Sequence, residues 1–217
     1  MDNPRDRILA KVRAALGRSG PLPVAGAEAM RTYLREHPQG PRPRAEWNLV
    51  ERFRARATAL DSTVDEVETM ASVPAAVARY LKANQLPLAA VVWPELAEMG
   101  WSEAGITAEA RKADGRDLVG ITASYCAIAE TGTMLMLSAA PTPAATSLLP
   151  ETHIAIVAMA RIVSGMEDAL ALVRKERGVL PRATNFVSGP SRTADIEQTL
   201  VLGAHGPYRV HIVLVQR

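Results

Sequence analysis

The sequence predicts an α/β protein in which helices cover both faces of a mostly parallel sheet. Short apolar runs bounded by turn residues, such as Leu88–Trp93, are typical of strands that are buried on both faces. These runs alternate with segments whose apolar residues recur at helical spacing, and that alternation favours a parallel sheet. The 217 residues are enough for one full domain with an extension.

The N-terminal extension, residues 1–44, is expected to hold a helix and a Pro/Gly-rich arm. Asn3 can cap a helix with Pro4 at its first position, and Gly17 would close that helix after Leu16. A second short helix is expected near Ala27–Arg35, between proline- and glycine-rich stretches. Such an arm lies across its own domain or a neighbouring subunit, or is disordered, and the sequence leaves these alternatives open.

Residues 45–217 are expected to form the α/β domain. Amphipathic helices are predicted over 45–60, from Ser72 to Asn84, and after a capping box at Ser164–Glu167 that opens a helix closed by Gly178. Strands are predicted at residues 63–67, 88–93, 118–122, 133–137, 154–158, 183–187 and 210–215.

Composition excludes several classes of function. A net charge of +2 and an aromatic content of 4% give no support to nucleic-acid binding. The single cysteine, Cys126, cannot form an internal disulfide or hold an iron–sulfur cluster alone, and its apolar neighbours predict a buried, inert thiol. The charged N-terminus has no apolar run behind it and no segment is apolar enough to span a bilayer, so we expect a cytoplasmic protein.

Three glycine-containing stretches carry most of the functional information. We call them the first loop (Ala129–Thr133), the second loop (Ser188–Asp195) and the third loop (Gly203–Pro207). Glycine lets a backbone approach a ligand closely, and polar side chains beside it then face that ligand. Because ligands of parallel sheets gather at the carboxyl ends of the strands, we expect the three loops to converge on one site there.

The first loop offers a carboxylate among hydroxyl groups. Glu130 is a candidate general base, nucleophile or ligand for a substrate hydroxyl, flanked by Thr131, Gly132 and Thr133 as candidate ligand-binding residues. The alternative is a carboxylate that accepts hydrogen bonds from neighbouring amides and shapes the turn.

The second loop resembles a strand-to-helix turn in which Ser191 caps the helix. The free amides of a helix start attract anions, and Arg192 can add a bidentate contact to a carboxylate or phosphate. Asp195 instead suits the positive end of such a helix, which is its simpler interpretation. The remaining candidates for ligand binding in this loop are Ser188, Gly189 and Thr193.

The histidines differ in their surroundings. His205 lies beside Gly206 in the third loop and is a candidate catalytic residue, with Gly206 a candidate ligand contact. His153 begins a predicted strand and is a weaker candidate for ligand binding, whereas His211 is expected to be a hydrogen-bonded core residue. No spacing typical of metal ligands occurs among His153, His205, Glu130 and Asp195, so no metal site is predicted.

Together these segments resemble the LUD domain family, and within it the proteins of L-lactate utilization. The resemblance spans roughly residues 45–217 and rests on Val119–Thr122, Ala127–Thr133, Ser147–Pro150 with His153, Ser188–Glu197 and Gly203–Pro207. It implies a sheet sandwich of the NagB/RpiA/CoA-transferase type.

The resemblance also implies a cytoplasmic three-protein system that oxidises L-lactate to pyruvate, with the iron–sulfur clusters on partner subunits. A lone cysteine fits a subunit that carries no cluster or other cofactor and that binds a small carboxylate or phosphate or docks its partners; a homo-oligomer is compatible with this. Two alternatives remain: a free-standing isomerase or acyl-CoA transferase-like enzyme using Glu130, and a regulatory or scaffolding module. Whether the chain itself catalyses a reaction is left open.

Overall fold

The computed structural model describes residues 3–18, 23–42, 46–196 and 199–217, and the chain divides into two compact units, residues 1–43 and 44–217. The first unit contains α1 (Pro4–Ala15) and α2 (Val24–Glu36), where both N-terminal helices were predicted. The side chain of Asn3 accepts a hydrogen bond from the Arg5 amide at 3.1 Å, as expected of a helix cap. No residue of either helix is buried.

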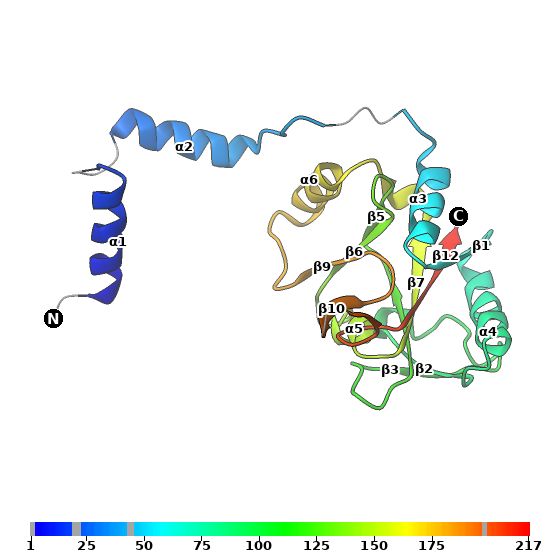
Figure 1. Cartoon of the computed structure of the whole chain (residues 1–217). Coiled ribbons are helices and arrows are strands. Elements are labelled where there is room, and N and C mark those ends of the chain that lie inside the picture. The colour runs from blue at the N-terminus through cyan, green and yellow to red at the C-terminus, as the bar shows by residue number, and fades with distance from the viewer. Residues whose placement is uncertain (1–2, 19–22, 43–45, 197–198) are drawn as a thin grey trace. The chain divides into compact units, whose positions relative to one another are not determined.

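A six-stranded parallel sheet forms the centre of the second unit (Figure 1), which confirms the predicted fold class. Its strand order is β1-β12-β7-β4-β2-β3, and every neighbouring pair is parallel. The strands are β1 (Thr63–Val67), β2 (Ala89–Val92), β3 (Thr107–Ala110), β4 (Val119–Ala123), β7 (Thr152–Ala158) and β12 (Arg209–Val215).

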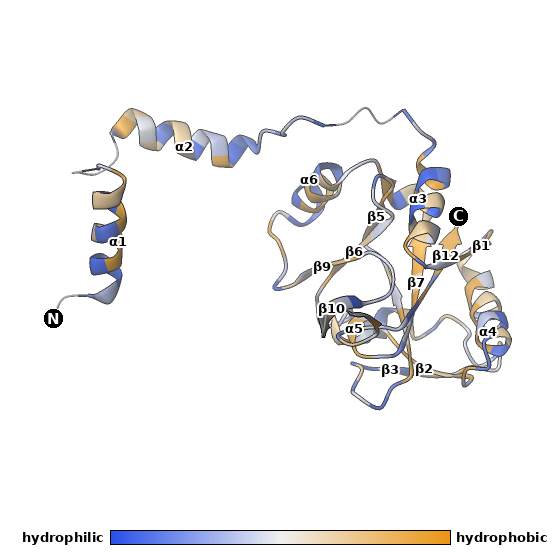
Figure 2. Cartoon of the chain, viewed as in Figure 1, coloured by the Kyte–Doolittle hydropathy of each residue, from blue (hydrophilic) through white to orange (hydrophobic). Residues whose placement is uncertain are grey.

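The helices of this unit follow the predicted positions closely. They are α3 (Leu49–Ala59), α4 (Val73–Ala83) and α6 (Met166–Arg177), with the short α5 (Ala145–Leu148) and the 3-10 turns η1 (Met70–Ser72), η2 (Pro94–Leu96) and η3 (Met159–Arg161). Figure 2 shows the apolar residues concentrated on the central strands, and β7 and β12 are buried over nearly their whole length. Within the described residues, no helix is long and apolar enough to cross a bilayer.

A second, four-stranded sheet packs beside the first. It consists of β8 (Ile162–Val163), β5 (Cys126–Ile128), β6 (Thr133–Leu137) and β9 (Thr184–Val187), in that order. The strand predicted at 133–137 is therefore present, but it pairs antiparallel with both neighbours instead of joining the parallel sheet. Met134 and Met136 point into the main core while Leu135 joins a separate cluster with Cys126.

The prediction of a helix after Ser191 was wrong. Residues from Arg192 onward form β10 (Arg192–Ile196), which pairs antiparallel with β11 (Thr199–Leu202). Thr193 lies opposite Val201, and such β-branched pairs favour a strand over a helix. No helix start is present here to bind an anion through free amides, because the described backbone around Ser191 is committed to other partners.

The capping box of α6 lies one residue later than predicted. Gly165 holds the cap position, and the Asp168 carboxylate accepts a hydrogen bond from the Gly165 amide at 3.0 Å. The acceptor is therefore Asp168 and not Glu167, which leaves Ser164 in the preceding turn.

Candidate functional sites

The second and third loops are joined through Ser191. The Ser191 amide donates to the Pro207 carbonyl at 2.9 Å, and the Gly203 amide donates to the Ser191 carbonyl at the same distance. A methyl group on Gly206 would lie 3.2 Å from the Ser191 Cβ, so the two loops pack tightly.

A chain of hydroxyl groups joins the first loop to the second. The Thr131 and Thr133 hydroxyls lie 2.7 Å apart, and the Thr133 and Ser188 hydroxyls also lie 2.7 Å apart. Thr133 is buried, Thr131 is partly exposed and Ser188 is exposed. Hydrogen bonds therefore connect the first loop to the second and the second loop to the third.

Two glycines fit these loops against the C-terminal end of α3. Gly132 and Gly189 both have positive φ, +72° and +78°. A Cβ on Gly132 would lie 2.5 Å from the Ala57 amide nitrogen, and one on Gly189 would lie 2.3 Å from the Leu60 carbonyl oxygen. Only glycine suits both the conformation and the space.

Among the described residues, the side chains of Glu130, Arg192 and His205 make no direct hydrogen bond or ion pair with one another. Arg192 forms an ion pair with Asp61, at the end of the turn that follows α3. Glu130 is partly exposed; its amide donates to the Ser164 carbonyl at 3.0 Å, and its carboxylate has no hydrogen-bond partner among the described residues. His205 is exposed. The side chain of Asp195 lies outside the described residues.

The second and third loops lie at the amino edge of the central sheet, not at the carboxyl edge where they were expected. Asp61, the partner of Arg192, precedes β1, and Pro207, the partner of Ser191, precedes β12. The third loop leads into its strand, and the backbone bonds of Ser191 hold the second loop beside it. We call the surface made by the three loops the loop surface.

His153 and His211 both lie in the core. His153 is fully buried on β7 and shares a 2.8 Å hydrogen bond with the Thr122 hydroxyl, so it is not exposed at the loop surface. His211 bonds the Thr63 hydroxyl at 2.8 Å and stacks on Tyr80, which confirms it as a hydrogen-bonded core residue. Burial lowers the pKa of each imidazole to about 4, because desolvation disfavours the charged form.

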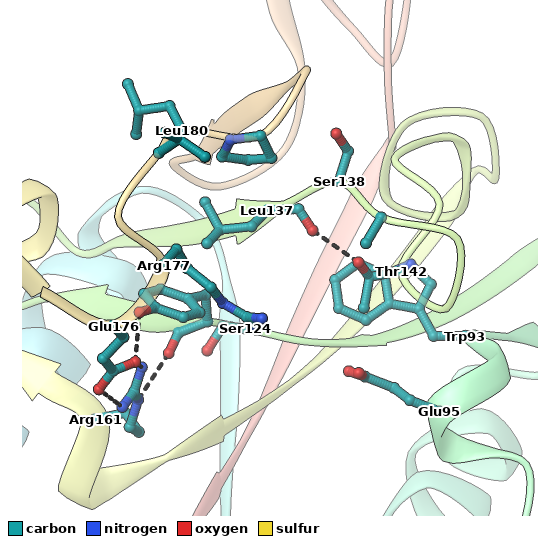
Figure 3. A pocket seen from close by; sticks show the side chains of 14 residues that line it. Trp93, Glu95, Ser124, Leu137, Ser138, Thr142, Arg161, Glu176, Arg177 and Leu180 are labelled. Carbon is teal, nitrogen blue, oxygen red and sulfur yellow. Dashed lines mark hydrogen bonds and ion pairs between the residues drawn. The ribbon is translucent and has the colours of Figure 1, made fainter. Parts of the chain in front are cut away.

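A cavity of about 500 Å³ opens at the carboxyl edge of the same sheet (Figure 3). We call it the carboxyl-edge cavity, and it contains none of the residues selected from the sequence. Its lining comes from the segments that follow β2, β4, β6 and β7 and from the end of α6: Trp93, Glu95, Ser124, Tyr125, Leu137, Ser138, Ala139, Thr142, Arg161, Glu176, Arg177, Val179, Leu180 and Pro181.

The topology places this cavity where parallel sheets bind ligands. The chain passes from β2 to β3 on one side and then returns to β4 on the other side of β2. The connections after β2 and β4 therefore run in opposite directions, and such neighbouring strands have a crevice between them at their carboxyl ends. The lining has no glycine motif, so only the position of its residues just after β2, β4 and β7 could have marked them in the sequence.

One wall of the cavity is a fixed network of charges. Arg161 contacts the Glu176 carboxylate through two nitrogens, at 2.7 and 2.9 Å, and the Tyr125 hydroxyl donates to the same carboxylate. The Arg161 side chain also donates to the Tyr125 carbonyl at 2.9 Å. The arginine beside it lowers the pKa of Glu176 to about 2, and the carboxylate in turn raises the pKa of Arg161.

The single cysteine, Cys126, lies in a hydrophobic cluster with Leu135 and Ala169. Cys126 is fully buried, as predicted, and burial raises the pKa of its thiol to about 11. Within the described ranges, no three His, Cys, Asp or Glu side chains are grouped so that they could hold a metal ion.

Fold and sites together define an α/β protein with a six-stranded parallel sheet, a hydroxyl-lined loop surface at one edge and a cavity at the other. Residues 97–215 match the LUD domain, and the chain belongs to the LUD domain family. Of the solved structures, it resembles a DUF162 family protein from Deinococcus radiodurans, with a TM-score of 0.59, 25% identity, and coverage of 81% of this chain and 99% of that one.

The curated relatives include proteins named lactate utilization protein C. The protein from Exiguobacterium is 32% identical over 182 residues, covering 79% of each chain. Those from Bacillus licheniformis and Bacillus subtilis are 40% and 43% identical over 101 and 100 residues, in each case 45% of this chain. The matched segments cover 42% of the length of these two relatives.

Proposed function

We propose that this chain takes part in lactate utilization, as a cluster-free subunit of an iron–sulfur-dependent system that oxidises L-lactate to pyruvate. The observation that carries the proposal is the similarity to the Exiguobacterium lactate utilization protein C, which extends over 79% of both chains. The buried Cys126 suits a subunit whose iron–sulfur partners supply the redox centres.

The loop surface is the part of the molecule proposed to serve this role. The Thr131 and Ser188 hydroxyls and the Arg192 guanidinium would bind a small carboxylate, or an acidic segment of a partner subunit. The side chains of Glu130 and His205 have no hydrogen-bond partner within the described structure, so either is available to contact the α-hydroxyl of a hydroxy acid.

Reconstitution with the iron–sulfur partners tests this role. Lactate-dependent dye reduction by the assembled system should require this chain, and Arg192→Gln should lower the rate about tenfold by removing one charge-assisted contact. Arg54→Gln is the matched control, because Arg54 forms a similar surface ion pair with Glu66 away from the loops. The proposal would be contradicted if dye reduction is equally fast without this chain, or if Arg192→Gln supports the full rate.

The alternative is a free-standing acyl-CoA transferase-like or isomerase activity based on Glu130. It draws on one observation: a partly exposed carboxylate at a tight turn with no hydrogen-bond partner among the described side chains. In the transferase version, the carboxylate attacks the thioester carbonyl, the C–S bond breaks and CoA leaves as the thiolate. Mass spectrometry after incubation with acyl-CoA donors should then show a glutamyl adduct that is absent from Glu130→Gln and retained in Glu151→Gln.

A further inference from the structure

The carboxyl-edge cavity combines an apolar wall with unpaired polar groups. Trp93 and Leu137 are almost completely buried and form the inner part of the apolar wall. Leu180 and Val179 form the outer part, and their exposed fractions are 52% and 78%. Apolar side chains this exposed beside a cavity lose contact with water when an apolar ligand covers them, which favours binding.

The polar groups of the cavity point to an anionic ligand with a hydrogen-bond donor. Arg177 lies within cation–π distance of Tyr125, at 5.8 Å, and makes no ion pair among the described residues. Glu95 likewise has no ion pair there, and desolvation raises its pKa. In Figure 3 the Arg177 guanidinium and the Glu95 carboxylate point into the cavity from opposite sides.

A third polar group of the cavity lining, the Ser124 hydroxyl, has no hydrogen-bond partner among the described residues. This hydroxyl is buried, although it lines the cavity. A buried hydroxyl without a partner is costly, and a ligand oxygen or nitrogen would relieve that cost. The Arg161–Glu176–Tyr125 network beside it keeps this end of the cavity in a fixed geometry.

We propose that the carboxyl-edge cavity binds an amphipathic organic acid larger than lactate. Its carboxylate or phosphate would pair with Arg177, a hydroxyl or N–H group would donate to Glu95, and its apolar body would lie against Trp93, Leu137 and Leu180. A volume of about 500 Å³ lies within the range of pockets that hold drug-sized molecules, whereas lactate alone would leave most of it unfilled. This site is separate from the loop surface and does not depend on the proposed role in lactate oxidation.

Two matched probes test the proposal on the full-length protein. Phenyllactate carries an aromatic body and the same hydroxy-acid group as L-lactate, and binding is followed by tryptophan fluorescence, since Trp93 lines the cavity. Phenyllactate should bind at least tenfold more tightly than L-lactate, because only it covers the apolar wall. Equal affinities, or no binding of phenyllactate at about 10 mM, would overturn the proposal.

Variants of exposed residues locate the probe without disturbing the core. Arg177→Gln should weaken phenyllactate binding about tenfold, whereas Lys175→Gln, the same charge change on the same helix outside the cavity, should not. Leu180→Ser should weaken it severalfold, with Leu149→Ser as control, because Leu149 is equally exposed, at 53%, and does not line the cavity. If Arg177→Gln and Leu180→Ser bind phenyllactate with the same affinity as the control variants, the probe binds elsewhere and the proposed site is refuted.

Discussion

At the scale of single residues, Gly132 and Gly189 determine how closely the loops approach α3. Each combines a positive φ with a missing side chain whose place is taken by backbone atoms of the α3 end. The positive φ and the close contact with α3 each make a side chain unfavourable. A substitution at another glycine, which has a positive φ but no close contact, separates the two contributions to the free energy of unfolding.

Gly132→Ala and Gly189→Ala should each lower the free energy of unfolding by about 3 kcal/mol, since left-handed strain and a backbone clash add together. Gly105→Ala is the control, because Gly105 has φ +78° but no neighbouring atom within 4 Å, and it should cost only about 1 kcal/mol. Urea unfolding measures all three. Equal losses at the three positions would show that the contacts with α3 do not constrain the loops.

The two core histidines should make the protein acid-sensitive. Their folded pKa of about 4 is below the ordinary value of 6.5, so the unfolded chain binds more protons between these limits. The stability is therefore complete above pH 6.5 and is lost as the pH falls towards 4, by about 3 kcal/mol for each histidine.

Urea midpoints measured between pH 4 and pH 7 test this dependence. His211→Phe keeps a ring against Tyr80 but removes the titrating group, so the slope with pH should fall by about half. The unsubstituted chain, measured over the same pH range, is the control. An unchanged slope in His211→Phe would show that this imidazole does not titrate as its burial requires.

At the scale of elements, α3 supports the loop surface from beneath. The Asn48 side chain caps its start, accepting hydrogen bonds from the Val50 and Glu51 amides at 3.0 and 3.2 Å. Phe53 and Ala57 bury its inner face. Gly132 and Gly189 pack against the C-terminal end of this helix.

Asn48→Ala should lower the free energy of unfolding by about 1 kcal/mol, and Asn48→Ser should recover most of that loss, because serine can accept the same amide hydrogen bonds. Circular dichroism during urea unfolding provides the measurement. A loss that serine fails to recover would mean that Asn48 acts through another contact.

Elements with strong periodicity were predictable from the sequence, and those defined by pairing were not. The strand at 63–67 has the same bounds in the structure as in the prediction, and α4 ends at Ala83, one residue before the predicted end at Asn84. By contrast, Arg192–Ile196 has turn-like residues before it and no clear alternation, and only its pairing with β11 makes it a strand. Local signals cannot report a partner that lies elsewhere in the chain.

The same limit applies to the sites. The glycine-containing motifs predicted the three loops, and the Thr133–Ser188 and Ser191–Pro207 hydrogen bonds do connect them. No motif predicted the carboxyl-edge cavity, because residues such as Trp93 and Arg177 have no distinctive spacing and meet only through the order of the strands.

At the scale of the whole molecule, the buried apolar residues belong to the second unit. Among the described residues, the first buried hydrophobic side chain is that of Phe53, and all the others follow it. A helix as short as α1 or α2 is marginal in water when it buries nothing.

A chain that begins at Arg44 should therefore unfold at the same urea concentration as the full chain, within the error of the measurement. Fluorescence of the tryptophans, all of which lie after residue 44, follows the transition in both chains. A lower midpoint in the shorter chain would show that residues 1–43 contribute to the stability of the remainder.

The strand β6 has one face in each of two hydrophobic clusters, with Met134 and Met136 on one side and Leu135 on the other. Neither cluster can open without exposing a face of this strand, so the two sheets should melt as one cooperative unit. Amide protons of β6 should consequently exchange with deuterium only through global unfolding, more slowly than those of the paired strands β10 and β11. The antiparallel strand that departs from the main sheet would then be the element that binds the domain into a single thermodynamic entity.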